Sequence, residues 1–291
     1  MGFTKVNIIV LGKNGQLAHH LGLLSKNIVN LGREDIDILS YDALAKKLDE
    51  FEIQGIINAS AYTAVDKAET EEKLAYDINT IGVKNISNYA ASKKLHLVHV
   101  STDYVFSGDK GSPYLVSDQH RPLGVYGKTK SHGEKAILDV YPTNSCIIRT
   151  SWVYSETGKN FVTTMLSLME SKSELSIVDD QIGSPTSAAA LAIACYHASI
   201  NKIVGIHHFT DSGVCSWYDF ALAIQDFGLK YGLLNKKIMI HPIPTSAYPT
   251  AAKRPSYSVL DKSRLTTDFG ISHPKHWRDE LEATIVKLTE H

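Results

Sequence analysis

A tyrosine and a lysine stand four residues apart in the segment VYGKTKSHGE, at Tyr126 and Lys130. If this segment is helical, both side chains lie on one face of the helix, one turn apart. A free phenol has a pKa of about 10, and a neighbouring positive charge lowers that pKa. The pair would then form a tuned general acid, and the lysine could also bind the ribose of a nicotinamide cofactor.

Hydroxyl groups stand at the end of the apolar stretch VHVSTDYVFSG, where Ser101, Thr102 and Asp103 follow the valines. The valines predict a strand, and open α/β sheets bind ligands at the carboxyl ends of their strands. Thr102 would therefore lie near Tyr126 and share a substrate oxygen with it.

The segment IIVLGKNGQLAHHLGLL in the first 24 residues predicts a strand, a glycine turn and a helix. Gly12 and Gly15 let the backbone approach a pyrophosphate, and Ala18 lets the helix pack closely on the sheet. The unpaired N–H groups at the start of that helix would bind the phosphates. The pattern predicts a dinucleotide at the first strand-to-helix turn.

The segment GREDID follows about twenty residues later, where a dinucleotide-binding domain contacts the adenosine ribose. Arg33 could receive a 2′-phosphate, whereas Asp35 or Asp37 could hold a free ribose. Both NADPH and NADH therefore remain open as the cofactor.

Short runs of valine and isoleucine alternate with helix-length segments through the first 150 residues, which is typical of repeated βαβ units. A long helix is predicted at Glu71–Lys93, with a buried stripe made of Leu74, Ile78, Ile81, Val83 and Ile86. Strands are predicted at Val6–Leu11, Ile28–Leu31, Gly55–Ala59, Leu97–Ser101 and Ser145–Thr150.

The predicted fold class is α/β, a Rossmann-type doubly wound parallel sheet with a smaller C-terminal substrate lobe. Residues 1–151 would form the dinucleotide-binding domain and residues 152–291 mainly the substrate lobe, where prolines concentrate. The chain would return to the cofactor domain around residues 181–210.

The 30 basic and 31 acidic residues give a formal charge of −1, so no overall field attracts nucleic acid or a membrane surface. No apolar run reaches the roughly 18 residues of a membrane helix, and we expect no signal peptide. Three widely spaced cysteines indicate reduced thiols in a cytoplasmic protein. A small molecule is the expected partner.

Together these features resemble the extended short-chain dehydrogenase/reductase family and, within it, the dTDP-4-dehydrorhamnose reductases. The resemblance extends from residue 12 to residue 261 and is carried by GKNGQLA, INASAYTAVDKAE, STDYVFSG, PLGVYGKTKSHGE, RTSWVY, IVDDQIGSPT and RPSYSVLD. It implies reduction of the C4 ketone of dTDP-4-dehydro-L-rhamnose by NADPH or NADH. That reaction is the last step toward dTDP-L-rhamnose for cell-surface polysaccharide.

The resemblance also implies the site residues. Tyr126 would protonate the forming alkoxide, Lys130 would tune it and bind the ribose, and Thr102 would hold the C4 oxygen. The substrate would further contact Asp103, Trp152 and Arg254. The implied cofactor-binding residues are Gly12, Asn14, Gly15, Gln16, Leu17, Arg33, Asp37, Ile38, Ala61, Tyr62, Thr63, Val100, Tyr126 and Lys130.

Some members of this family hold magnesium at a dimer contact through acidic side chains, one of them from the helix after the glycine turn. Here that helix offers His19 and His20, so we expect no metal. Neither this pair nor His207 with His208 has a third ligand at a suitable spacing. Both a monomer and a homodimer remain open.

Other functions are built on the same scaffold. A 4,6-dehydratase commonly presents Thr-Asp-Glu, but this chain has Thr102-Asp103-Tyr104 and lacks the second carboxylate. An epimerase or another nucleotide-sugar reductase would keep the same catalytic pair. A non-catalytic protein resembling the NADP-binding regulatory subunit of methionine adenosyltransferase would not need the pair at all.

Overall fold

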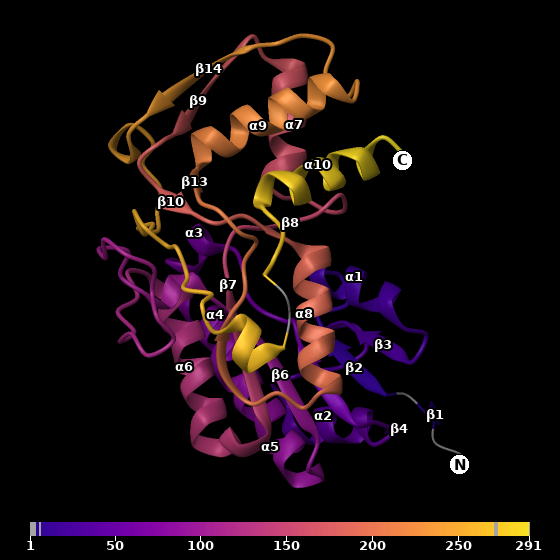
Figure 1. The fold of residues 1–291 in the computed structure, drawn as a ribbon. Helices are drawn as coiled ribbons and strands as arrows, with labels where there is room; N and C mark the ends of the chain where they lie inside the picture. The colour runs from indigo at the N-terminus through magenta and orange to yellow at the C-terminus, as the bar shows by residue number, and fades with distance from the viewer. Residues whose placement is uncertain (1–3, 6, 271–272, 291) are drawn as a thin grey trace.

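A six-stranded parallel sheet forms the body of the protein (Figure 1). The computed structural model describes residues 4–5, 7–270 and 273–290, so Val6 of the first predicted strand lies outside the described residues. The strand order is β12-β7-β6-β5-β2-β3, which confirms the predicted doubly wound α/β sheet. The six strands are β2 (Ile8–Leu11), β3 (Ile28–Leu31), β5 (Gly55–Asn58), β6 (His96–Thr102), β7 (Ser145–Thr150) and β12 (Gly205–His208).

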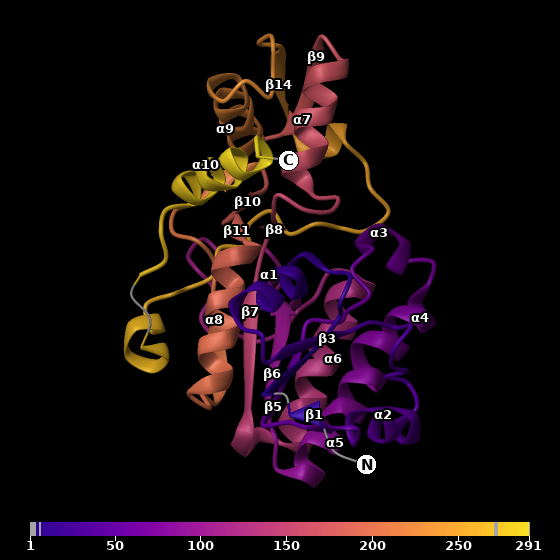
Figure 2. The same cartoon turned by 90° about the vertical axis from the view of Figure 1, so that its right-hand side faces the viewer.

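Helices cover both faces of this sheet (Figure 2). Successive side chains of a strand point to opposite faces, and this alternation creates two cores. Ile8 and Val10 pack toward α1 and α8, whereas Ile9 and Leu11 pack toward the helices of the other face. One face carries α1 (Gln16–Leu24) and α8 (Ala188–Ile200), and the other carries α2 (Tyr41–Leu48), α5 (Val83–Lys93) and α6 (Val125–Val140).

A second group of elements lies beyond the carboxyl ends of the strands, at the top of Figure 1. Its core contains Val162, Met165, Phe220, Ile224 and Leu281. No helix in the described part of the chain is long and apolar enough to cross a membrane. The elements of this group are α7 (Phe161–Ser171), β9 (Glu174–Val178), α9 (Trp217–Lys230), β14 (Met239–Ile243) and α10 (Trp277–Leu288).

The remaining strands are short. β10 pairs with β13 and β11 with β8, each over two residues, and β1 pairs with β4. Their bounds, with those of two short helices, are β1 (Thr4–Lys5), β4 (Phe51–Glu52), α3 (Val65–Ala68), α4 (Glu72–Tyr76), β8 (Val153–Tyr154), β10 (Ile182–Gly183), β11 (Thr186–Ser187) and β13 (Cys215–Ser216).

The long helix predicted at residues 71–93 is interrupted by a π-helical segment, Asp77–Gly82, between α4 and α5. Each π turn takes more residues than an α turn, so the buried face shifts along the sequence. Leu74, expected in the buried stripe, is 45% exposed, while Asn79 and Thr80 are buried. The predicted stripe is therefore wrong at its start.

Helix α6 presents a polar face to the sheet, with Lys130 and Glu134 buried. Arg149 of β7 donates to Glu134 from Nη2 to Oε2 at 2.7 Å and from Nε to Oε1 and Oε2 at 3.0 and 3.1 Å. Ser101 of β6 donates to the same carboxylate. Because all these groups are buried, the ion pair fixes how α6 lies on β6 and β7.

The ion pair predicts a large loss of stability when one partner is removed. Arg149→Met leaves the carboxylate of Glu134 buried without its partner, which should lower the free energy of unfolding by about 3–5 kcal/mol. Urea unfolding measures the loss. Lys135→Ala removes an exposed pair with Asp139 from the same helix and should change stability little. Equal effects of the two substitutions would contradict the role of the buried pair.

Candidate functional site

The carboxyl ends of β2 and β5 approach each other closely at Gly12. This residue has φ of 109°. A Cβ atom there would lie 2.9 Å from the backbone of Ala59 and Ser60, so only glycine fits. Helix α1 then begins after Gly15, whose position has no side-chain cap, leaving the N–H groups of its first turn available to an anion.

The loop with Ala61, Tyr62 and Thr63 is held by Asn79. Its Oδ1 accepts from the backbone N–H of Tyr62 at 2.8 Å. Its Nδ2 donates to the carbonyl of Tyr62 and to Oγ1 of Thr129, both at 3.1 Å. The π-helical segment turns Asn79 inward, so the loop and α6 share one support that the sequence pattern did not reveal.

Asp35 and Asp37 of the GREDID segment, the two candidates for binding the ribose, have different surroundings. The carboxylate of Asp35 accepts from the backbone N–H of Gly32 at 2.9 Å and from Lys13 at 3.3 Å. These hydrogen bonds lower the pKa of Asp35. Asp37 is exposed, as is Arg33, and its Oδ1 accepts only locally, from the N–H of Leu39. Ile38 is half-buried and would meet any Cβ placed at Gly82.

Thr102, Asp103 and Tyr126 converge at the end of β6. Oγ1 of Thr102 donates to Oδ1 of Asp103 at 2.9 Å and accepts from the backbone N–H of Tyr104 at 3.2 Å. The ring of Tyr126 meets that of Tyr104 edge-on, with centroids 5.5 Å apart. The three residues that the sequence placed together are thus neighbours in space.

The side chain of Lys130 is hydrogen-bonded to β6. Its Nζ donates to the carbonyl of Val100 at 2.7 Å and lies 3.2 Å from Nε2 of His99. Burial lowers the pKa of Lys130 to about 8, and the charge of Glu134 opposes that shift. The predicted tyrosine and lysine therefore share helix α6, with the ammonium hydrogen-bonded to the strand.

The expected effect of Lys130 on the phenol is wrong. Burial raises the pKa of Tyr126 above its ordinary value, and a hydrogen bond with Thr102 opposes this shift without cancelling it. The sequence spacing correctly placed both groups on one helix face. It could not show that the phenol is desolvated and that Lys130 is held by β6.

A cavity of about 730 Å³ lies among α7, β9, α9 and the chain near residue 250. Trp217 and Arg254 belong to its wall. Trp152 has φ of 49° and stacks flat on Trp217, with centroids 3.5 Å apart. A Cβ on Gly183 would lie 2.6 Å from the indole of Trp152, so the stack is tightly enclosed. Trp217 was not identified from the sequence.

Arg254 connects this cavity with the candidate catalytic residues. Its Nη2 donates to Oδ2 of Asp66 at 2.7 Å, and its Nη1 donates to the hydroxyl of Tyr104 at 3.3 Å. Tyr104 in turn packs against Tyr126. The cavity wall itself includes Arg254 but neither Tyr126 nor Lys130, so Tyr104 forms the contact between the two regions.

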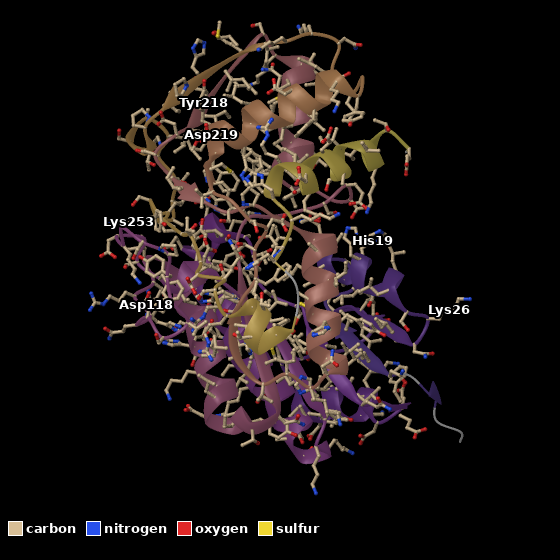
Figure 3. All side chains as sticks on the ribbon, in the orientation of Figure 1. His19, Lys26, Asp118, Tyr218, Asp219 and Lys253 are labelled. Carbon is tan, nitrogen blue, oxygen red and sulfur yellow. The ribbon has the colours of Figure 1, made fainter. Side chains whose placement is uncertain are left out.

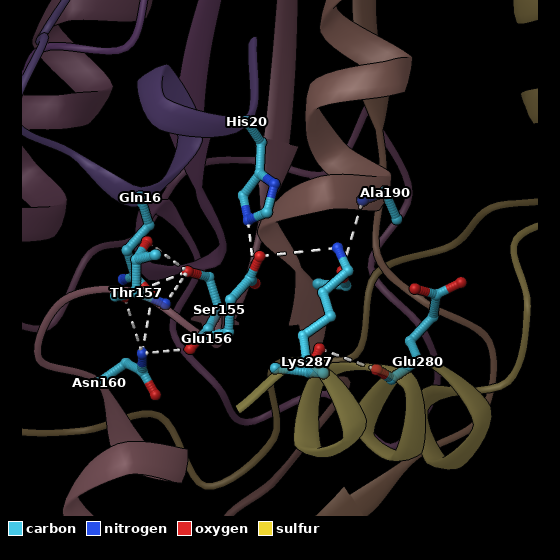
Figure 4. Close-up of polar contacts among 11 residues, drawn as sticks. Gln16, His20, Ser155, Glu156, Thr157, Asn160, Ala190, Glu280 and Lys287 are labelled. Carbon is cyan, nitrogen blue, oxygen red and sulfur yellow. Dashed lines mark hydrogen bonds and ion pairs between the residues drawn. The ribbon is translucent and has the colours of Figure 1, made fainter. Parts of the chain in front are cut away.

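The two histidines of α1 lie in different surroundings. His19 is exposed and points away from the protein (Figure 3). His20 is buried, with Nε2 3.2 Å from Glu156, and Lys287 lies 3.6 Å from the same carboxylate (Figure 4). An ammonium beside this carboxylate does not fit a divalent cation. Among the described residues, no group of three or more metal-binding side chains occurs.

The second histidine pair belongs to the sheet. His207 and His208 lie on β12 and are both buried. Burial, with the nearby charge of Arg149, lowers the pKa of His208 to about 3. A neutral imidazole therefore packs beside the ion pair of α6 and β7.

Comparisons with known proteins identify the family. The family model described as the RmlD substrate binding domain matches residues 6–290. A dTDP-4-dehydrorhamnose reductase from Aggregatibacter actinomycetemcomitans is 40% identical over 94% of this chain and 97% of its own length. The chain belongs to the dTDP-4-dehydrorhamnose reductase family.

Two solved structures of the family have the same fold. The dTDP-4-dehydrorhamnose reductase from Clostridium acetobutylicum superposes with a TM-score of 0.90 at 38% identity, covering 98% of this chain and all of the other. The enzyme from Bacillus anthracis, solved in complex with NADP, gives 0.91 at 34% identity with the same coverage. The family likeness therefore extends over the sheet and the C-terminal elements alike.

Asp103 predicts a pH dependence of stability. The carboxyl is 2% exposed, and burial raises its pKa to about 6. Because ionisation is disfavoured in the folded protein, the stabilising effect of the neutral carboxyl is complete below pH 4 and is lost as pH rises through 6. The loss amounts to about 3 kcal/mol.

Asp103→Asn keeps an oxygen for Thr102 but cannot ionise, so it should lack this loss. Urea unfolding from pH 4 to 8 compares it with the wild-type protein, and Asp139→Asn on the surface of α6 serves as control. If the stability curves of wild type and Asp103→Asn run parallel over this range, the buried carboxyl does not titrate as described.

Proposed function

We propose that this protein reduces the C4 ketone of dTDP-4-dehydro-L-rhamnose to dTDP-L-rhamnose, using NADPH or NADH. The observation that carries the proposal is the position of Thr102 and Tyr126. Thr102 ends β6, in the sheet that also carries the glycine turn after β2, and Tyr126 at the start of α6 packs on Tyr104, whose hydroxyl accepts from Arg254 of the cavity wall. The cofactor, when bound, supplies the hydride.

Tyr126 donates the proton in this proposal. A phenol whose pKa is raised by burial keeps its proton at neutral pH and releases it only to a strong base, such as the alkoxide forming at C4. Thr102, whose Oγ1 is placed by Asp103 and the N–H of Tyr104, holds the same oxygen once its hydroxyl proton turns from Asp103 to that oxygen. The geometry therefore provides a donor that acts when the alkoxide develops.

The remaining residues bind and orient the two ligands. Gly12 and the first turn of α1 hold the pyrophosphate of the cofactor, and the loop around Tyr62, fixed by Asn79, lies along it. Lys130 binds the nicotinamide ribose. The nucleotide half of the substrate enters the cavity, where Arg254 faces the diphosphate and Trp217, stacked on Trp152, offers an aromatic wall.

The same residues argue against two alternatives. A dehydratase needs a second carboxylate after Asp103, but the position holds Tyr104, whose ring packs against Tyr126. A regulatory cofactor-binding protein has no need for a buried proton donor at the strand end. Both the hydroxyl pair and the cavity fit turnover of a nucleotide sugar.

A coupled test decides the proposal. The purified protein is mixed with dTDP-4-dehydro-L-rhamnose and either NADPH or NADH, and loss of absorbance at the nicotinamide band is followed. The sugar product is then identified by NMR. Consumption of one cofactor with formation of dTDP-L-rhamnose supports the proposal, and absence of consumption with both cofactors would sink it.

Removing the phenol hydroxyl should abolish most turnover. Tyr126→Phe loses the general acid, which is typically worth about 10²–10⁴-fold in kcat, while the packing against Tyr104 remains. Steady-state kinetics and a cofactor-binding titration measure the two effects separately. Tyr41→Phe, on the exposed start of α2, is the control. Unchanged kcat in Tyr126→Phe would remove this residue from the mechanism.

The glycine turn should be required for cofactor binding. Gly12→Ala forces a methyl group against the backbone of Ala59 and Ser60 and places alanine at a positive φ. Both effects displace the turn, so the Kd for NADPH should rise at least about tenfold. Fluorescence titration with NADPH measures Kd. Gly232→Ala has a similar φ of 74° but open space around it and should bind normally. Equal affinities of the two variants would refute the placement of the pyrophosphate.

A further inference from the structure

Two buried polar residues interrupt the apolar face of the sheet below α6. Asn58 and His99 are 1% and 0% exposed and are direct neighbours on β5 and β6. The preceding residues on the same face, Ile56 and Leu97, are apolar and belong to the core. A buried polar group costs free energy unless it is hydrogen-bonded, so the contacts of this pair define its role.

The contacts of Asn58 fix the orientation of its amide. Both the backbone N–H and the hydroxyl of Ser60 approach Oδ1 of Asn58, at 3.1 and 2.6 Å. A backbone N–H can only donate, so this atom is the oxygen. The NH₂ group must then face His99, where Nδ2 lies 3.0 Å from Nδ1, and Nδ1 must accept.

This hydrogen bond determines the tautomer of His99. Burial and the charge of Lys130 hold the pKa of His99 well below its ordinary value, so the ring is neutral. With Nδ1 accepting, the single ring proton is on Nε2. Nε2 lies 3.2 Å from Nζ of Lys130, and its N–H points toward the amine.

An ammonium at Lys130 would therefore face another donor. A neutral amine has a lone pair that accepts from Nε2–H while Nζ still donates to the carbonyl of Val100. We propose that Asn58 and His99 are positioning residues that hold the side chain of Lys130 and favour its neutral amine, through the hydrogen-bonded chain Ser60, Asn58, His99 and Lys130.

The charged and polar groups around Lys130 belong to α6, β6 and β7. Glu134, one turn further along α6, favours the ammonium, although Arg149 of β7 shares its carboxylate. Tyr126 lies one turn earlier on the same helix, and β6 contributes His99 and the carbonyl of Val100. Glu134 thus favours the ammonium form of Lys130, whereas the imidazole N–H of His99 favours the neutral amine.

This balance has a consequence that rests on the proposed function. When Tyr126 gives its proton to the C4 alkoxide, it becomes a phenolate. The ammonium of Lys130 can return a proton to that phenolate and becomes an amine, which the N–H of His99 then stabilises. A proton from water restores the ammonium, so the net proton comes from solvent.

Asn58→Asp tests the inference, because a carboxylate reverses the hydrogen-bond direction. One oxygen still accepts from Ser60, and the other accepts from Nδ1–H of His99. Nε2 then has no proton and accepts from the ammonium of Lys130. Nitrogen-15 NMR of the imidazole in protein without cofactor distinguishes the tautomers, and His99→Gln assigns the signals.

The inference predicts protonated Nε2 in the wild-type protein and protonated Nδ1 in Asn58→Asp. Protonated Nδ1 in the wild-type protein would overturn it. Asn201→Asp is a matched control, since the exposed Asn201 also places its amide nitrogen 3.2 Å from Nδ1 of a histidine, His197. This control should leave the signals of His99 unchanged.

The pH profile of kcat provides a second measurement. Loss of activity at high pH should follow loss of the ammonium, so Asn58→Asp should move the basic limb to higher pH by about one unit or more. A purely structural role would lower kcat without moving the limb, and that result contradicts the inference. If the wild-type protein shows no reductase activity, the proposed function fails while the tautomer measurement still decides this inference.

Discussion

The carboxylate of Glu134 is the group on which the arrangement of the site depends. It is fully buried and is compensated by Arg149 from β7 and by the hydroxyl of Ser101 from β6. A buried charge is tolerated only with its partners in place, so these contacts allow one rotation and one height of α6 on the sheet. Lys130 and Tyr126, one and two turns earlier on the same face, are positioned as a result.

The two faces of the sheet differ in the polarity of their side chains. The face under α1 and α8 is apolar and supplies stability. On the face under α6, the polar residues Asn58, His99 and Ser101 lie near the carboxyl ends of β5 and β6. Aliphatic side chains occupy this face nearer the amino ends of the same strands. β6 ends one residue after Ser101, at Thr102, whose hydroxyl donates to Asp103. The chemistry proposed for this protein takes place at this end of β6.

The sequence predicted the local features of this site well, because they depend on short-range patterns. The glycine turn, the hydroxyls after the valines of β6 and the helical spacing of Tyr126 and Lys130 are all visible in single segments. Glu134 could have been found the same way, as the next position on that face. The partners from other elements could not, since Trp217 and Asn79 reach the site only through tertiary packing and a π-helical segment.

Burial explains the one wrong chemical expectation, since spacing carries no information about desolvation and the pKa of Tyr126 rises. In the proposed reaction, hydride arrives at the sugar carbon beside Thr102 and Tyr126. The most direct measurement uses NADPH or NADH deuterated at the transferable position and locates the label in the sugar product by NMR and mass spectrometry. The product should carry one deuterium, at C4. A sugar product without deuterium, or with the label at another carbon, would contradict it.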